Sequence, residues 1–374
     1  MRQRRLQGVS ALNPRCSRAF FSKADFSMQR RFLFTVLFSA SLLGLGSSQA
    51  LAQTVMPLRV LSHGSFDLPK EALAAFEKDA GVKLEIIKAG DAGEMLNKLI
   101  LTRANPIADV VFGIDNTLAP RAIAAQVLSP YSGPAAQRKA VVDLPQGLVP
   151  VDYGYVNLNI DKAWFAKKGL ALPTSLADLT QPAYAKLLVV QNPATSSPGQ
   201  AFLLATIAGL GEEGGFAWWA QMRANGVKVV KGWSEAYYTE FSRNGGAYPI
   251  VVSYTSSPAA EVFYSKEKIS ESPTANLFLK GGVFRQVEGV ALVKGGNPKA
   301  AEAAGRFIEF LRSTAIQEAL QTTMWVFPAE ANAVRADVIK QHAVEPTAFD
   351  ALKAPLTDAQ AKTWLQRWTK TVLK

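Results

Sequence analysis

The feature that most constrains the fold is an alternation of short apolar runs with amphipathic helical segments. Residues 58–61 have the pattern of a strand, and residues 67–80 have that of a helix. Residues 82–87 and 107–114 are two further strand-like runs, separated by a helical pattern over 94–104. Strands that alternate with helices of this length form βαβ units on a parallel sheet. The pattern therefore predicts an α/β fold.

The same alternation resumes after residue 151 and predicts a second lobe. Strand-like runs at 186–191 and 248–254 enclose a helical pattern over 198–210, and another strand follows at 284–293. A chain of this length exceeds what one hydrophobic core fills. The expected division is an N-terminal extension with a signal peptide at 1–52, the first part of lobe I at 53–155, lobe II at 156–284, and the return to lobe I with C-terminal helices at 285–374.

The N-terminus has the pattern of a secretory signal peptide. Met28-Gln29-Arg30-Arg31, with two basic residues, precedes the uncharged apolar run 32–45, and Ala50-Leu51-Ala52 supplies a small-residue cleavage site. The apolar run is too short for a comfortable membrane span. We expect translation to start at Met28, cleavage after Ala52 and a periplasmic product. Cys16 is the one cysteine, so the mature chain would have neither disulfides nor a lipoprotein cysteine.

The charge distribution argues against a nucleic-acid-binding protein. The whole chain has a formal net charge of +11, from 41 basic and 30 acidic residues. Eight of the basic residues but one acidic residue lie in 1–52, which leaves 33 against 29 in the rest. A net charge of +4 over some 320 residues is no electrostatic footprint for nucleic acid.

The sequence lacks the common catalytic and cofactor-binding motifs, or has them outside the secondary structure that such a motif requires. The G-x-G-x-x-G pattern at 209–214 follows a helix, not a strand, so it predicts a helix end instead of a dinucleotide site. His63 and His342 are the two histidines, and with no mature cysteine they exclude zinc motifs built on His and Cys. There is no P-loop and no G-x-S-x-G elbow. We expect no enzyme, no cofactor and no metal.

Two strand-to-helix connections carry polar residues where an α/β sheet presents them to a cleft. Thr195, Ser196 and Ser197 precede a helix, where hydroxyls and free N–H groups can hold an anion or, equally, cap the helix. Asp91 precedes another helix and can accept from a ligand amino group. The alternative for Asp91 is a capping box with Glu94.

Three aromatic residues follow glycine, strand or turn segments: Trp233, Tyr254 and Trp325. Each alone is more often a core residue than a ligand contact. Converging in one cleft, their π-faces would suit a flat cationic ring, because the ring quadrupole attracts a cation.

At these residues the chain resembles the periplasmic thiamine-binding proteins of ATP-binding-cassette importers. The matching segments are Val110–Asn116, Asp152–Tyr155, Lys231–Tyr237, Ser253–Ala259 and Thr323–Pro328. They occur in the family's order between about Leu58 and Phe327. Each segment alone is a weak signal, but five in order are specific.

The resemblance implies a two-lobed type II binding-protein fold that closes on thiamine or its phosphates and delivers it to a membrane permease with its ATPase, as a monomer. Asp91 would bind the aminopyrimidine, and Trp233, Tyr254 and Trp325 would surround the rings. Thr195, Ser196 and Ser197 would contribute to the end that accepts the hydroxyl or phosphate. His63 stands where the family has an aromatic residue, so we count it in the site and expect one wall to differ.

Two alternatives remain open. The adjacent pair Tyr237-Tyr238 could serve a ferric-iron receptor of related fold, with tyrosinates as ligands. Neighbours on a helix point about 100° apart, so one of the pair is more often a core residue. A thiamine-degrading enzyme of similar fold would need a nucleophilic cysteine, which the mature chain lacks.

Overall fold

The computed structural model describes residues 55–145 and 147–374, which form one compact unit. The signal peptide, the start at Met28 and the cleavage site after Ala52 lie outside these residues. Among the described residues, no helix combines the length and the apolar character needed to cross a bilayer.

Eleven strands of the described residues are joined by hydrogen bonds into one sheet. Its main path runs in the order β2 (Val82–Lys88), β1 (Met56–Ser62), β3 (Val110–Asp115), β10 (Phe284–Val293), β5 (Val149–Asp161), β8 (Ile250–Tyr254), β6 (Leu188–Gln191) and β7 (Lys228–Val230). The short strands β4 (Leu128–Ser129), β9 (Thr274–Leu277) and β11 (Phe327–Pro328) pair with β10 or β5. The strands at each end of the path are parallel, whereas β10 and β5 in the middle are antiparallel to their neighbours.

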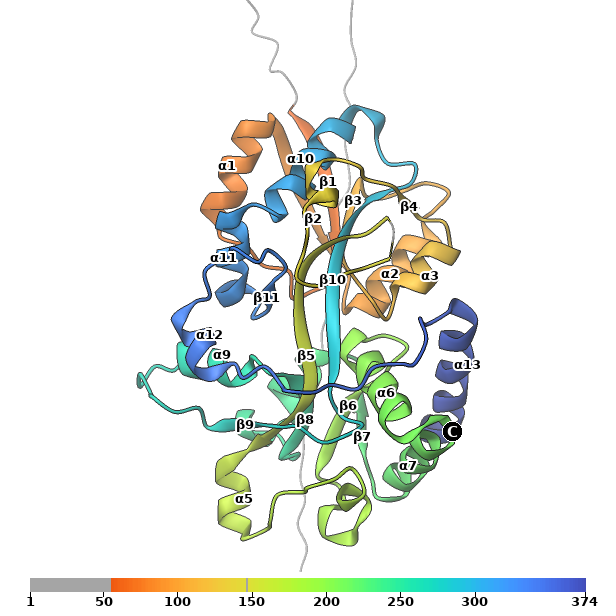
Figure 1. Ribbon diagram of the computed structural model, residues 1–374, viewed down its shortest axis with the longest axis vertical. Helices are drawn as coiled ribbons and strands as arrows, with labels where there is room; N and C mark the ends of the chain where they lie inside the picture. Colours follow the sequence, from red (N-terminus) through yellow and green to blue (C-terminus); the bar gives the residue numbers. More distant parts are fainter. Residues whose placement is uncertain (1–54, 146) are drawn as a thin grey trace, which may run out of the picture. The chain divides into compact units, whose positions relative to one another are not determined.

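The long strands β5 and β10 connect the two lobes (Figure 1). The start of β5 pairs with β10 where β10 also pairs with β3, and its end pairs with β8. All residues of β5 but Pro150 are buried, as expected of a strand that both lobes cover. One pair of strands therefore belongs to both lobes.

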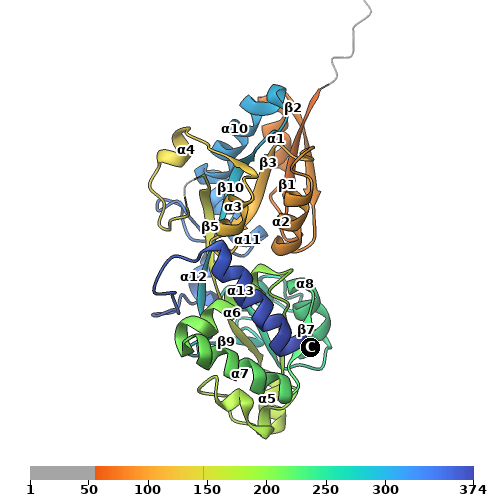
Figure 2. The ribbon, with the colours of Figure 1, turned by 90° about the vertical axis from the view of Figure 1, so that its right-hand side faces the viewer.

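In lobe I, helices cover both faces of the sheet (Figure 2). Successive side chains of a strand point to opposite faces, and β1 follows this rule. Leu58 and Val60 pack in the core beneath α1 (Lys70–Ala80) and α10 (Ala301–Leu311), whereas Leu61 packs beneath α2 (Ala92–Leu101) and α3 (Ala119–Ala124). The predicted helices and strands of this lobe are confirmed, with ends shifted by a few residues.

Lobe II has its own core, beneath α6 (Ser197–Leu210) and α7 (Glu212–Ala224). The C-terminal helix α13 (Asp358–Trp368) packs against this core, beside α6 and α7 in Figures 1 and 2. Trp368 is fully buried and meets Trp219 of α7 edge-on, with ring centroids 5.5 Å apart. The division of the chain expected from the sequence, with lobe boundaries at 155/156 and 284/285, leaves open against which lobe the C-terminal helices pack.

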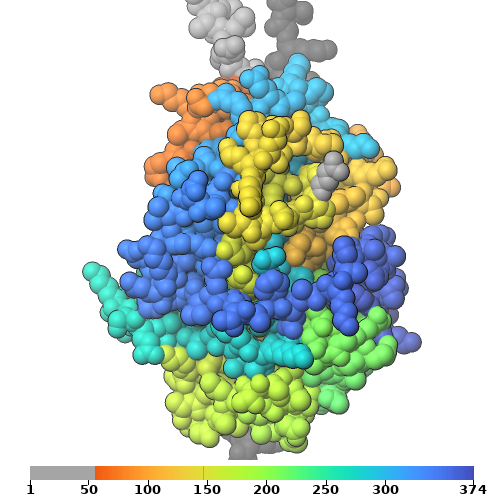
Figure 3. All heavy atoms as spheres, viewed as in Figure 1, coloured from red at the N-terminus to blue at the C-terminus, as the bar shows by residue number. Residues whose placement is uncertain are grey.

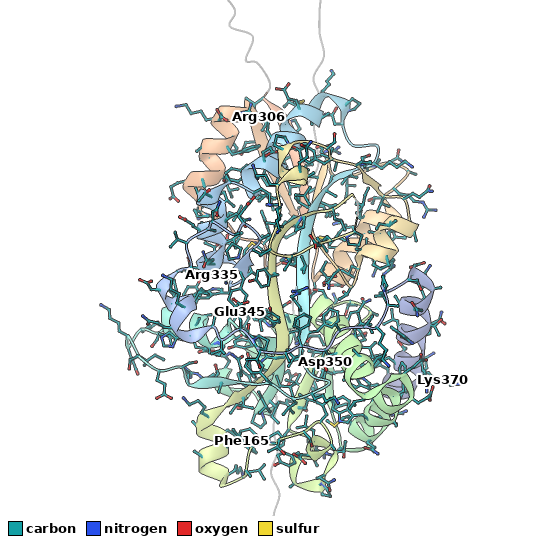
Figure 4. All side chains as sticks on the ribbon, viewed as in Figure 1. Phe165, Arg306, Arg335, Glu345, Asp350 and Lys370 are labelled. Carbon is teal, nitrogen blue, oxygen red and sulfur yellow. The ribbon has the colours of Figure 1, made fainter. Side chains whose placement is uncertain are left out.

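The C-terminal segment between α12 (Asp337–His342) and α13 crosses over β5 and β10, and it covers this face in Figure 3. Arg335 donates to the hydroxyl of Tyr153 on β5 over 2.8 Å and pairs with Glu345 over 3.2 Å. Asp350 accepts from the Gly281 N–H over 2.8 Å, next to the start of β10. Figure 4 labels Glu345 and Asp350 of this segment, and Arg335 just before α12.

The remaining helices are short and lie in the connections between the larger elements of the two lobes. They are α4 (Pro134–Gln137), α5 (Lys162–Lys168), α8 (Trp233–Glu235), α9 (Ser257–Phe263) and α11 (Thr314–Thr323), with 3₁₀ or π turns between them.

The glycine-rich pattern at 209–214 is confirmed as a helix end. It forms the turn between α6 and α7, and Gly211 has a φ of 77°, which an L side chain rarely adopts. No strand precedes it, so the pattern lacks the context of a dinucleotide site.

Replacement of Trp368 by alanine should destabilise lobe II. A buried tryptophan truncated to alanine costs roughly 3–5 kcal/mol of unfolding free energy, through lost burial and the cavity left behind. Urea unfolding followed by circular dichroism measures this loss. Leu373→Ala, at a half-exposed position near the same end, is the control and should change the unfolding free energy by less than about 0.5 kcal/mol. Equal effects of the two variants would refute a structural role for the Trp368 contact.

Candidate ligand-binding site

A cavity of about 640 Å³ lies between the lobes, and both lobes and the crossing strands line it. Of the eight residues predicted for the site, six line the cavity: His63, Asp91, Ser197, Trp233, Tyr254 and Trp325. Thr195 and Ser196 lie next to Ser197 in the chain but outside the lining.

One wall of the cavity is a group of aromatic rings around Trp233. Trp233 stacks on Tyr237, with centroids 5.1 Å apart and an angle of 17° between the planes. Tyr254 lies 6.5 Å away on the strand β8. The indole N–H of Trp233 donates to the Ser253 hydroxyl over 2.9 Å, which fixes the ring orientation. Trp233, Tyr237 and Tyr254 all line the cavity.

Trp325 forms a second aromatic group with Phe263 and Tyr264, at centroid distances of 5.2 and 5.4 Å. Its backbone φ is 60°, a left-handed conformation that a residue other than glycine adopts at a cost. The Ser256 hydroxyl of lobe II donates to the Trp325 carbonyl. The structure thus holds Trp325 in a strained conformation at the edge of the cavity.

Asp91 caps α2 and also bonds to the other lobe. Its Oδ1 accepts from the Ala92 N–H over 2.7 Å, and its Oδ2 accepts from the Trp233 N–H over 3.0 Å. The alternative of a capping box with Glu94 is wrong, because the Glu94 carboxylate pairs with Lys231 over 2.7 Å. Asp91 and Glu94 therefore each join α2 to the segment that carries Trp233.

The hydroxyls of residues 195–197 have three different environments. Thr195 donates to the Lys231 carbonyl over 2.6 Å. Ser196 occupies the N-cap position of α6 but makes no cap hydrogen bond, and its buried hydroxyl has no partner among the described residues. Ser197 alone of the three lines the cavity. Of the two alternatives for these hydroxyls, binding an anion or capping the helix, side-chain capping of α6 is therefore wrong for Ser196.

Three carboxyl groups form a row beside the cavity, two of them in its lining, and the sequence reasoning missed all three. Glu288 of β10 is opposite Asp115 of β3 on one side and opposite Asp152 of β5 on the other. Opposed residues of antiparallel strands have their side chains on the same face. All three are buried, and Asp152 and Glu288 line the cavity. We call Asp115, Asp152 and Glu288 the carboxyl row.

His63 lies next to the carboxyl row. Its Nε2 is 3.3 Å from the Glu288 carboxylate, although the angle is not that of a hydrogen bond, and its Nδ1 accepts from the Ser65 N–H over 3.2 Å. Burial is the largest single influence and lowers the pKa of His63, but the nearby Glu288 carboxylate and the charge of Asp91 together outweigh it, so the net direction is upward. This contact explains how a histidine is accommodated where the resembling family has an aromatic residue.

Two members of the carboxyl row, Asp115 and Asp152, have raised pKa values because they are buried and lie beside Glu288. Burial raises the pKa of Asp115 to about 7 even though Thr117 and the Leu118 N–H donate to it. Burial, with Glu288 next to it, raises the pKa of Asp152 well above its usual value. Neither carboxyl oxygen of Asp152 accepts a hydrogen bond from the described residues. Asp152 therefore has unused hydrogen-bonding capacity at the cavity.

The pair Tyr237-Tyr238 is not arranged as a metal site. Tyr237 is buried and donates to Glu261 over 2.9 Å, whereas Tyr238 is exposed and its ring lies at 85° to that of Tyr237. Burial raises the pKa of both phenols, which opposes the tyrosinate form that Fe(III) prefers. The described part of the chain also contains no group of three or more His, Cys, Asp or Glu residues that could hold a metal.

The pKa of Asp115 predicts a loss of stability as the pH rises. The folded state keeps this proton up to about pH 7, whereas an unfolded aspartate loses it near 3.8. Between these values the folded state binds more protons, so the unfolding free energy falls as the pH rises. Asp115→Asn keeps an Oδ1 acceptor and should remove part of this fall, on the order of 4 kcal/mol at most. Urea unfolding between pH 4 and pH 8 measures it.

Asp109 provides a control of opposite sign. Burial acts to raise its pKa, but hydrogen bonds from Arg59 and the backbone lower it overall. Stability from this group is present at neutral pH and is lost on acidification. Asp109→Asn should therefore lower the unfolding free energy at pH 7. It should not make the fall of the unfolding free energy with rising pH any steeper. A pH profile of Asp115→Asn identical to that of the unmodified chain would contradict the assignment.

Comparison with known proteins agrees with this architecture. The profile of the family described as bacterial extracellular solute-binding protein matches residues 105–355. The thiamine-binding periplasmic protein of Salmonella typhimurium is 32% identical over 312 residues, which are 80% of this chain and 86% of that protein. A solved periplasmic thiamin binding protein superimposes with a TM-score of 0.72 at 29% identity, covering 84% of this chain and 96% of the other.

More distant structures share the fold. A ferric binding protein from Campylobacter jejuni has a TM-score of 0.63 at 20% identity, and the match covers 84% of this chain and 97% of that one. At this identity the likeness is one of fold alone. The predicted two-lobed type II binding-protein fold is confirmed, and the chain belongs to the family of bacterial extracellular solute-binding proteins.

Proposed function

We propose that the protein is a periplasmic receptor that binds thiamine between its two lobes and delivers it to the permease of an ATP-binding-cassette importer. The observation that carries the proposal is the cavity between the lobes, which combines aromatic walls with buried carboxyl groups. Thiamine is a flat, permanently cationic thiazolium joined to an aminopyrimidine, and such a cavity complements both rings. The thiamine-binding name of the Salmonella relative supports the same ligand.

The aromatic walls would hold the rings of the ligand. Trp233 and Tyr254 lie on one side of the cavity and Trp325 on another. A cation over the face of a tryptophan or tyrosine gains electrostatic attraction, and more so where water is excluded. The thiazolium is the group that this arrangement favours.

The hydroxyl groups at two helix starts would hold the other end of the ligand. Ser197 at the start of α6 and Ser256 and Ser257 at the start of α9 line the cavity. Hydroxyls and free backbone N–H groups there can donate to the alcohol oxygen of thiamine or to the oxygens of its mono- or diphosphate. Thr195 and Ser196 would support this end from outside the lining.

Asp91 would have two roles. It lines the cavity, where its carboxylate can accept from the aminopyrimidine, and it accepts from the Trp233 N–H of the other lobe. Ligand contact and lobe closure would then share one side chain. The crossing strands near Tyr155 and Glu288 would form the hinge, since they are the sheet connection between the lobes.

The location and partners follow from the same function. A receptor of this kind acts in the periplasm, after removal of the signal peptide ending at Ala52. Its partners would be the permease and the ATPase that drives it, and the receptor would act as a monomer. No cofactor is required, since the ligand is released unchanged.

The test is a titration of the exported, ligand-free protein with thiamine, followed by tryptophan fluorescence, with Fe(III)-citrate in parallel. Saturable quenching at micromolar or lower thiamine is the expected result, because Trp233 and Trp325 line the cavity. No response to thiamine by fluorescence or calorimetry, together with a visible charge-transfer band from iron, would instead support the ferric alternative through Tyr237 and Tyr238.

Trp233→Ala should weaken thiamine binding by at least about 1 kcal/mol, or about five-fold in Kd, through loss of the contact between cation and ring. Isothermal titration calorimetry measures the change. Trp164→Ala is the matched control, because Trp164 packs against the core of lobe II away from the cavity and should leave Kd unchanged. An unchanged Kd in Trp233→Ala would remove this residue from the site.

A further inference from the structure

We infer that the carboxyl row and His63 form a cation-selective floor that releases protons when the ligand binds, so that ligand affinity rises with pH. This inference rests on the proposed function, and it adds how the site distinguishes a cationic ligand from a neutral one. Its physical basis is the arrangement of four titratable side chains in one buried group.

The geometry places the four groups within reach of one another. Asp115, Glu288 and Asp152 are opposed residues on three neighbouring strands, and the His63 imidazole lies 3.3 Å from Glu288. Asp115 and Asp152 are fully buried, and Glu288 and His63 are less than one-tenth exposed. Like charges this close cannot all be ionised in a buried site. The group must therefore retain protons near neutral pH.

Asp152 provides an independent sign of a ligand. It is fully buried, it lines the cavity, and neither of its oxygens accepts a hydrogen bond from the described residues. Burying a polar group without a partner costs free energy. A cationic or hydrogen-donating ligand in the cavity would supply the missing partner.

The direction of the proton movement does not depend on which group holds the proton. A fixed positive charge that enters the cavity repels a proton on His63 and stabilises the anionic form of Asp152 or Glu288. Both effects drive a proton from the protein to solvent. The thiazolium has a fixed charge and no proton to release near neutral pH, so the proton comes from the protein.

Other charged groups face the same floor, and none cancels this effect. Lys88 and Asp91 line the cavity beside His63 from the end of β2 and the start of α2. Tyr254 of β8 lies over the row, and its hydroxyl donates to Gln286 of β10 over 3.0 Å. Burial and the nearby carboxyl groups raise the pKa of Tyr254 well above its usual value, so this phenol stays neutral.

Calorimetry in buffers of different ionisation enthalpy counts the protons released. Thiamine is titrated into the exported protein at pH 7 in phosphate, PIPES and Tris, and the measured enthalpy is plotted against the buffer enthalpy. We expect a slope equal to release of about half to one proton per ligand. Kd should then fall about three-fold to ten-fold per pH unit between pH 6 and pH 8. An enthalpy independent of the buffer would overturn the inference.

Two variants locate the source of the protons, and one control checks them. Asp152→Asn and His63→Gln each remove one proton site from the floor and should each reduce the number released. Glu213→Gln is the control, because Glu213 is paired with Arg367 on the surface of lobe II and lies outside the cavity lining. Its proton count should equal that of the unmodified protein. If Asp152→Asn fails to fold, His63→Gln provides the same test.

The two proposals fail in different ways. Absence of thiamine binding at every pH would overturn the proposed function. Thiamine binding without proton release, or with full release in both floor variants, would overturn this inference and leave the receptor function intact.

Discussion

The pairing of β5 with β10 is the interaction on which the rest of the structure depends. These two strands hydrogen-bond to each other where the lobes meet. In addition, β10 pairs with β3 of lobe I, and β5 pairs with β8 of lobe II. They therefore define where the two mostly parallel half-sheets meet. The cavity lies at this junction, with Asp152 and Glu288 projecting into it from the two strands. The strands that connect the lobes therefore also supply part of the lining of the cavity.

Much of the fold could be predicted because buried parallel strands have a strong sequence signal. Every residue of β3 is buried, and its continuous apolar run was identified as a strand. The end of α6 at a glycine was also predicted correctly, since its position after a helix excluded the nucleotide-binding alternative. The packing of α13 on lobe II was not predictable, because an amphipathic pattern indicates that a helix packs but not against what.

The site was predicted in part, for a reason that lies in strand topology. Trp233, Tyr254 and Ser197 were found because they lie at strand ends or helix starts, where α/β sheets bind ligands. Asp152 and Glu288 lie inside long strands. At such positions the sequence alone does not distinguish a site residue from any other residue of the sheet. The segment Asp152–Tyr155 resembles a family segment, but nothing in one strand reveals which residue of the neighbouring strand lies opposite it. The register across three strands was needed to bring Asp115, Glu288 and Asp152 into one row.

The order of the chain through the two lobes has a consequence for folding. Lobe I is completed by β10, α10 and α11, which follow all of α6 and α7 in the sequence. Lobe II in turn is completed by Trp364, Trp368 and Val372 at the very end of the chain. Neither core can therefore be assembled from the residues first synthesised, and contacts of such long sequence separation form slowly. The topology therefore makes the folding of each lobe depend on residues that are synthesised after most of the other lobe.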